Sequence, residues 1–147
     1  MEELPRYSIS PVTETDSALL DENGKRISRV PGIVLEKAFR LLDGSFLIIT
    51  SDDCPFEEGF HISLIKADGS LLETTHRAIP YAPGIIKSLQ VQSDNTIKMM
   101  FHDGEVVFVT VQSKASRSPS KYIQQRFRSA NGIFGKHHLA IDSNVKE

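Results

Sequence analysis

The chain has 147 residues, of which 39% are hydrophobic and 24% charged, which is ordinary for one globular domain with its own core. No apolar run reaches the roughly 18–20 residues of a membrane-spanning helix, and the acidic start MEELPRYSIS lacks the apolar stretch of a signal peptide. The single cysteine, Cys54, cannot close an internal disulfide. We therefore expect a cytoplasmic protein without a membrane segment.

The charge is distributed unevenly along the chain. Residues 1–110 contain 10 Lys and Arg against 17 Asp and Glu, a net charge of −7, whereas residues 111–147 contain 7 against 2, a net charge of +5. An acidic body favours a basic partner, and a basic tail either binds nucleic acid or folds back onto the body.

Turn dipeptides separate short apolar runs throughout the first 110 residues. They are Asn23-Gly24, Asp43-Gly44, Asp68-Gly69, Asp94-Asn95 and Asp103-Gly104. Gly and Asn tolerate the positive φ of tight hairpin turns, so the pattern predicts antiparallel strands. Both Asp-Gly-Ser triplets are interpreted as turns and not as catalytic pairs, because neither serine has a base or an oxyanion hole in its sequence context.

A longer repeat is visible in the order of these turns. Val30-Pro31-Gly32-Ile33-Val34 recurs as Ala82-Pro83-Gly84-Ile85-Ile86, and Asp43-Gly44-Ser45 corresponds to Asp94-Asn95-Thr96. We interpret residues 17–62 and 63–112 as two copies of a four-stranded antiparallel unit, within a mainly β domain that spans residues 1–112. The unit resembles a β-propeller blade, which implies an open partial propeller or a ring of several copies. The alternative is that the strands form a sandwich.

The C-terminal part, residues 113–147, is expected to pack on the β domain. It begins as a basic, Ser-rich linker, and a short helix is predicted from Ser118 as the N-cap and Pro119 as the first helical residue to the stop signal Asn131-Gly132.

The connection at residues 51–59 is the first candidate site. It is longer than the equivalent His102-Asp103-Gly104-Glu105 turn, and an insertion in only one copy of a repeat is a reasonable place for function. The predicted partner-binding residues are four acids and an aromatic anchor, Asp52, Asp53, Phe56, Glu57 and Glu58.

Other sequence signals of chemistry are weak. The five histidines show no metal-ligand spacing, and no phosphate-binding glycine loop is present, so we expect neither a metal, nor a cofactor, nor enzymatic activity. The basic tail is the alternative site, with Lys121, Arg126 and Arg128 for phosphates and Tyr122 for stacking on bases in nucleic acid.

The small size, the acidity and the β architecture together resemble bacterial immunity proteins, which neutralise toxins. That resemblance implies a non-catalytic module whose acidic surface blocks the active site of a basic, nuclease-like toxin. The alternatives are nucleic-acid binding through the tail and a blade protein that assembles into a ring scaffold.

Overall fold

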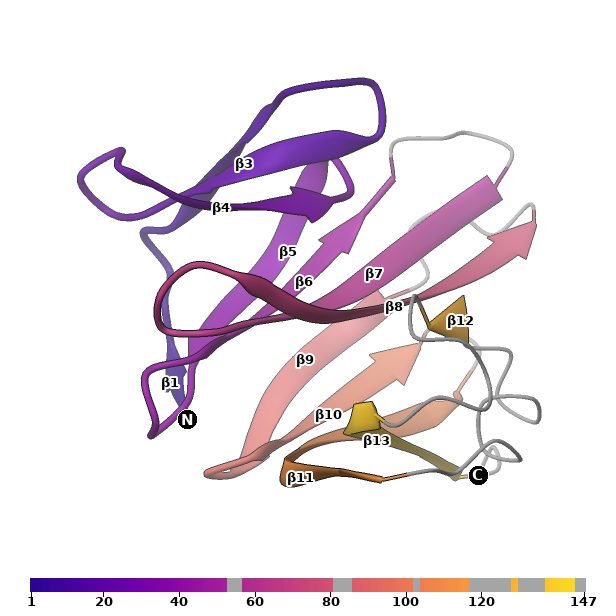
Figure 1. Cartoon of the computed structure of the whole chain (residues 1–147). Coiled ribbons are helices and arrows are strands. Elements are labelled where there is room, and N and C mark those ends of the chain that lie inside the picture. Colours follow the sequence, from indigo (N-terminus) through magenta and orange to yellow (C-terminus); the bar gives the residue numbers. More distant parts are fainter. Residues whose placement is uncertain (53–56, 81–85, 102–103, 117–127, 130–136, 145–147) are drawn as a thin grey trace.

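The computed structural model describes residues 1–52, 57–80, 86–101, 104–116, 128–129 and 137–144. These residues form three antiparallel sheets stacked in layers (Figure 1). The expectation of a mainly β, antiparallel fold is thus confirmed. Among the described residues there is no helix, and therefore none that is long and apolar enough to cross a membrane.

The N-terminal sheet has three strands in the order β2-β3-β4. They are β2 (Ser8–Pro11), β3 (Asp16–Leu20) and β4 (Arg26–Pro31). The turn between β3 and β4 is built by Asp21, whose carboxylate accepts the backbone N–H groups of Asn23 and Lys25. Gly24 supplies the positive φ of 79° that this turn requires.

The central sheet has six strands in the order β1-β5-β6-β7-β8-β12. They are β1 (Glu2–Glu3), β5 (Val34–Arg40), β6 (Phe46–Ser51), β7 (Glu57–Ile65), β8 (Leu71–Pro80) and β12 (Arg128–Ser129). The C-terminal sheet has the order β13-β11-β10-β9. Its strands are β9 (Ile86–Ser93), β10 (Thr96–Phe101), β11 (Val106–Ser116) and β13 (His137–Asn144).

Both Asp-Gly-Ser triplets form the predicted turns. In each, the aspartate carboxylate accepts the N–H and the hydroxyl of the serine two residues later, at 2.9 and 2.5 Å for Asp43 and 2.9 and 2.6 Å for Asp68. Gly44 and Gly69 have φ values of 86° and 91°. The serine hydroxyl bond is the main cause that lowers the pKa of Asp43 and of Asp68. The triplets thus close hairpins.

The core divides into two clusters because the central sheet is covered on both faces. Successive residues of β6 point to opposite sides: Phe46 and Ile48 pack toward the N-terminal sheet, and Leu47 and Ile49 pack toward the C-terminal sheet. All six residues of β6 are buried. A continuous apolar run such as FLII is expected for a strand with apolar partners on both faces.

Polar contacts also join the central sheet to the C-terminal sheet. The carboxylate of Glu73 in β8, only 2% exposed, accepts the backbone N–H groups of His138 at 2.7 Å and Leu139 at 3.2 Å in β13. Arg77 in β8 pairs with Glu105 at 2.7 Å, and its guanidinium lies 5.4 Å from the ring centroid of Phe101. The C-terminal strand is thereby tied to the body.

The two expected units, residues 17–62 and 63–112, are not confirmed. Their common boundary falls inside β7, and β7 pairs with β8 along its length. The observed sheets instead group β5 to β8 and β9 to β11 with β13. The repeat in the turns is present in the sequence, but in the structure the first Pro-Gly-Ile segment connects β4 to β5, and the second, residues 83–85, lies outside the described residues.

The predicted C-terminal linker and helix are also not confirmed. β11 continues through Ser116, so the first residues of the expected linker, 113–116, belong to a strand. Residues 118–127 and 130–131 of the expected helix lie outside the described residues, and Arg128–Ser129 form the short strand β12, which pairs with β8. The backbone groups of Arg128 and Ser129 thus pair with the edge strand β8 and not with the next turn of a helix.

Candidate functional site

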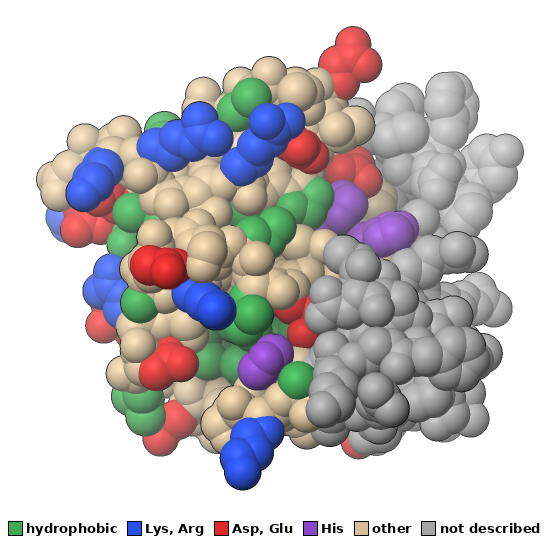
Figure 2. Space-filling view, viewed as in Figure 1, with side chains coloured by type: hydrophobic (Ala, Val, Ile, Leu, Met, Phe, Trp, Pro, Cys, Tyr) green, Lys and Arg blue, Asp and Glu red, His purple; other side chains and the backbone are tan. Residues whose placement is uncertain are grey.

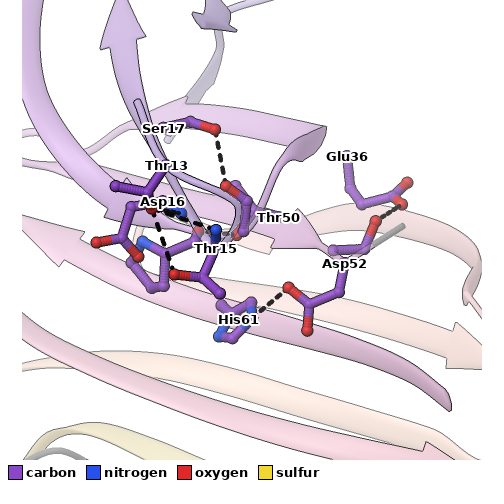
Figure 3. Close-up of polar contacts among 11 residues, drawn as sticks. Thr13, Thr15, Asp16, Ser17, Glu36, Thr50, Asp52 and His61 are labelled. Carbon is purple, nitrogen blue, oxygen red and sulfur yellow. Dashed lines mark hydrogen bonds and ion pairs between the residues drawn. The ribbon is translucent and has the colours of Figure 1, made fainter. Parts of the chain in front are cut away.

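A pocket of about 350 Å³ lies where the N-terminal and central sheets meet, at the start of the β6–β7 connection (Figure 3). Three separate segments contribute to it: the β2–β3 turn, the β4–β5 connection and the facing ends of β6 and β7. Its lining residues are Glu14, Thr15, Asp16, Pro31, Ile33, Asp52 and His61.

Gly32 lies between the lining residues Pro31 and Ile33 and packs closely against β6. It has a φ of 95°, its N–H donates to the carbonyl of Thr15 at 2.7 Å, and its carbonyl accepts the hydroxyl of Ser17 at 2.8 Å. The hydroxyl of Thr50 donates to the carbonyl of Pro31 at 2.6 Å. A Cβ on Gly32 would collide with Thr50 and would lie 3.3 Å from the His61 ring, so only glycine fits here.

Asp52 and His61 form the central polar pair of the site. The Nε2 atom of His61 lies 2.9 Å from Oδ1 of Asp52, and the two side chains are 16% and 38% exposed. The N–H of Asp52 donates to the carbonyl of Gly59 at 2.8 Å. A Cβ on Gly59 would collide with the Asp52 carboxylate, so this glycine lets the carboxylate lie against the strand.

The β2–β3 turn adds two more carboxylates. Thr13 accepts the N–H groups of Thr15 and Asp16 with its hydroxyl oxygen, which holds the turn. The carboxylate of Asp16 pairs with Arg29 at 3.1 Å, and Glu14 on the same turn is exposed. Three carboxylates therefore surround the pocket, and one of them is paired with a permanent cation that is not itself part of the lining.

Apolar groups complete the pocket. Pro31 and Ile33 are half-buried on the connection between β4 and β5. The Thr50 hydroxyl already donates to a backbone carbonyl. The arrangement therefore combines negative charge with an apolar wall, and this combination suits a long cationic side chain that has an aliphatic stem.

A second cavity, of about 290 Å³, provides a contrast. It is lined by Glu3, Leu4, Pro5, Tyr7, Leu35, Glu36, Lys37 and Ala38. Here Lys37 pairs with Glu3 at 2.8 Å, and Glu36 accepts the hydroxyl of Ser51 at 2.7 Å. This cavity already contains its own cation, so the Asp52–His61 pocket has the larger excess of negative charge.

The surface around the sites is mixed in charge. Among the described residues on the face seen in Figure 2, basic and acidic side chains are interspersed, with no continuous acidic area. The net charge of the body therefore does not by itself define a binding surface on this face. A local group of carboxylates with fixed geometry is a better-defined feature.

Of the predicted partner-binding residues, only Asp52 is fully described, and it lies in the pocket. Asp53 and Phe56 lie outside the described residues, as do the side chains of Glu57 and Glu58. The backbone of Glu57 and Glu58 belongs to β7, where they pair with Pro80 and Ile79, so the connection is shorter than the expected 51–59.

The alternative nucleic-acid site is largely beyond the described part of the chain. Lys121, Tyr122 and Arg126 lie outside the described residues, and the backbone of Arg128 lies in β12, opposite His76 of β8. This assignment stays a prediction.

Sequence reasoning missed His61, Glu14 and Asp16. The signal for His61 was present but weak: Asp52 and His61 flank one connection, and pairing of Thr50 with His61 across β6 and β7 brings them together. No local pattern relates Glu14 and Asp16 to either residue, because they reach the pocket through the packing of a different sheet.

Among the described residues, no three His, Cys, Asp or Glu side chains come together in a way that would hold a metal ion. Comparisons of the chain with models of protein families, with curated proteins and with solved structures found no match.

Proposed function

We propose that this chain is a non-catalytic protein-binding module of the immunity type. In this proposal it binds a basic, nuclease-like toxin in a bacterial cytoplasm and blocks the toxin's active site. The observation that supports it most is the pocket formed by Glu14, Asp16 and Asp52 beside the apolar wall of Pro31 and Ile33. Complementary charge of this kind accelerates association and selects the partner.

The pocket suits a lysine or arginine side chain from the partner. The aliphatic stem would lie against Pro31 and Ile33, and the cationic head would face the Asp52 carboxylate. Because the Thr50 hydroxyl holds the carbonyl of Pro31 and Gly32 packs closely against Thr50, a partner would not have to order this wall on binding. Preorganisation of this kind improves affinity because less conformational entropy is lost.

The proposal is tested with the product of the reading frame next to this chain, by measuring binding at several salt concentrations. We expect an affinity that falls as salt rises, and a loss of roughly tenfold in Asp52→Asn. Asp94→Asn is the matched control, because Asp94 is an exposed acid on the β9–β10 turn, outside the pocket. Equal effects of the two substitutions, or no binding to the neighbouring product, would contradict the proposal.

We also propose that the sheets are blade-like units of a partial propeller. Support comes from two antiparallel meanders, β5-β6-β7-β8 in the central sheet and β9-β10-β11 in the C-terminal sheet. The face-to-face stacking of the sheets also supports it (Figure 1). The ring of copies remains the alternative arrangement. The mass in solution separates the two, because an open arc is expected to be a monomer and a closed ring a small multiple.

A further inference from the structure

The Asp52–His61 pair places an ionisable ring beside a carboxylate inside the acidic pocket. Nε2 of His61 is 2.9 Å from the Asp52 carboxylate, and the histidine side chain is only 16% exposed. Histidine is the residue type whose charge ordinarily changes between pH 5 and 8, whereas carboxyl groups ordinarily titrate below that range. The charge of the pocket therefore depends on the protonation of one ring.

Charged or titratable groups approach His61 from several elements. Asp52 follows β6, Glu14 and Asp16 come from the β2–β3 turn, and Arg29 of β4 pairs with Asp16. His76 of β8 is the cross-strand neighbour of His61, with ring centroids 5.7 Å apart. Among the described residues, Glu36 of β5 also lies nearby in the sheet, where its carboxylate accepts the hydroxyl of Ser51, the residue before Asp52.

We propose that His61 is a proton-operated switch for this pocket: protonation of its ring neutralises Asp52 and weakens the attraction of the pocket for a cationic side chain. The role in partner control rests on the proposed function, but the change in local charge does not. The partner would bind more tightly at pH 7.5 than at pH 5.5.

The geometry allows this change without a large movement. A neutral ring with its proton on Nε2 donates to the Asp52 carboxylate, and the carboxylate keeps its full negative charge. A protonated ring makes the same hydrogen bond as a charge-assisted pair, and the local charge of the two groups falls to zero. By linkage, a bound cation opposes protonation of His61 to the same extent, so cation binding displaces a proton from the protonated ring.

The test measures local electrostatic potential directly. A cationic nitroxide and a neutral nitroxide are added separately to the protein, and the relaxation enhancement of backbone amide protons is compared at pH 7.5 and 5.5. The ratio of cationic to neutral enhancement reports how strongly each site attracts positive charge. We expect this ratio to fall by about 1.5-fold at Thr15, Ile33 and Gly59 when His61 becomes protonated.

Three variants identify the group that is responsible. His61→Gln keeps an N–H donor for Asp52 but cannot be protonated, so the ratio should stay high at both pH values. Asp52→Asn should lower the ratio at pH 7.5. His76→Gln should retain the pH change, and its disappearance in that variant would assign the switch to His76 and overturn the proposal.

Two controls keep the result interpretable. The amide of Asn95, on the distant β9–β10 turn, should show the same ratio in wild type and in each variant, which also shows that the variant is folded. A wild-type ratio at the pocket that does not change with pH overturns the switch, even if the toxin binds in a salt-sensitive way. Failure of toxin binding alone would contradict the proposed function and leave the electrostatic result standing.

Discussion

Strands β6 and β10 hold equivalent positions in their sheets, yet they are buried differently. All six residues of β6 are buried, whereas in β10 buried and half-buried residues alternate. When the Asp43-Gly44 turn is aligned with Asp94-Asn95, Leu47 of β6 corresponds to Lys98 of β10. The cross-strand partner of Leu47 is Phe39 in β5, and that of Lys98 is Gln90 in β9.

The difference follows from the number of sheets that each strand contacts. The central sheet has an apolar partner on either face, whereas the apolar residues of β10 that join a core cluster, Ile97, Met99 and Phe101, all face the central sheet. Lys98, which lies between Ile97 and Met99, therefore points away from the central sheet. The stack has a polar surface on that side, and its stability should depend most on the central sheet.

The largest expected effect tests this comparison directly. Leu47→Ala removes a fully buried side chain and should lower the free energy of unfolding by about 3 kcal/mol, because a cavity is left between two sheets. Lys98→Ala, at the equivalent position of β10, should change it by about 0.5 kcal/mol or less. Urea unfolding measures both, and similar losses would show that the outer face of β10 is packed as tightly as β6.

The connection between the N-terminal and central sheets is tested by Gly32→Ala. A positive φ and a collision with Thr50 should together cost about 2–3 kcal/mol. Gly24→Ala is the matched control, because Gly24 also has a positive φ but has open space where a Cβ would lie, so we expect about 1 kcal/mol. If the two variants lose equal stability in urea, the close packing around Gly32 is unimportant.

The contact between the central and C-terminal sheets is tested at Glu73. Glu73→Ala leaves the N–H groups of His138 and Leu139 without their carboxylate acceptor, and should cost about 2 kcal/mol. Glu73→Gln keeps one acceptor oxygen and should cost less. Hydrogen exchange should show faster exchange at His138 and Leu139 in the alanine variant. Unchanged protection there would argue that the buried carboxylate does not hold β13.

The smallest effect concerns the turns of the central sheet. Ser45→Ala removes the hydroxyl that lowers the pKa of Asp43, and should cost about 0.5 kcal/mol at pH 7. A depressed pKa stabilises the fold above the unfolded value near 4, and this contribution is lost as the pH falls through the folded value. The difference between wild type and variant should therefore shrink as the pH falls below the ordinary aspartate value of about 4. A difference that persists in acid would contradict this origin.

Much of the fold was predictable where the determinants are close in sequence. The Asp-Gly-Ser turns were predicted because the carboxylate, the flexible glycine and the hydroxyl lie within three residues. The grouping of strands was not predictable, since turns mark hairpins but do not say which strand begins a sheet. The boundary expected between residues 62 and 63 fell inside β7 for that reason.

The candidate site was predictable only at Asp52. His61 becomes its partner through the register of β6 and β7, and Glu14 and Asp16 reach the same pocket because the N-terminal sheet packs on the central one.

The sequence by itself determined the antiparallel hairpins, because turn chemistry and apolar alternation act over a few residues. Only the tertiary structure decided that FLII is buried on both faces and that an aspartate, a histidine and the acids of a distant turn share one pocket. These outcomes depend on which sheet faces meet. Face-to-face packing is driven by the burial of apolar area, which is non-directional, so an apolar run indicates burial but does not say which sheet will cover each face.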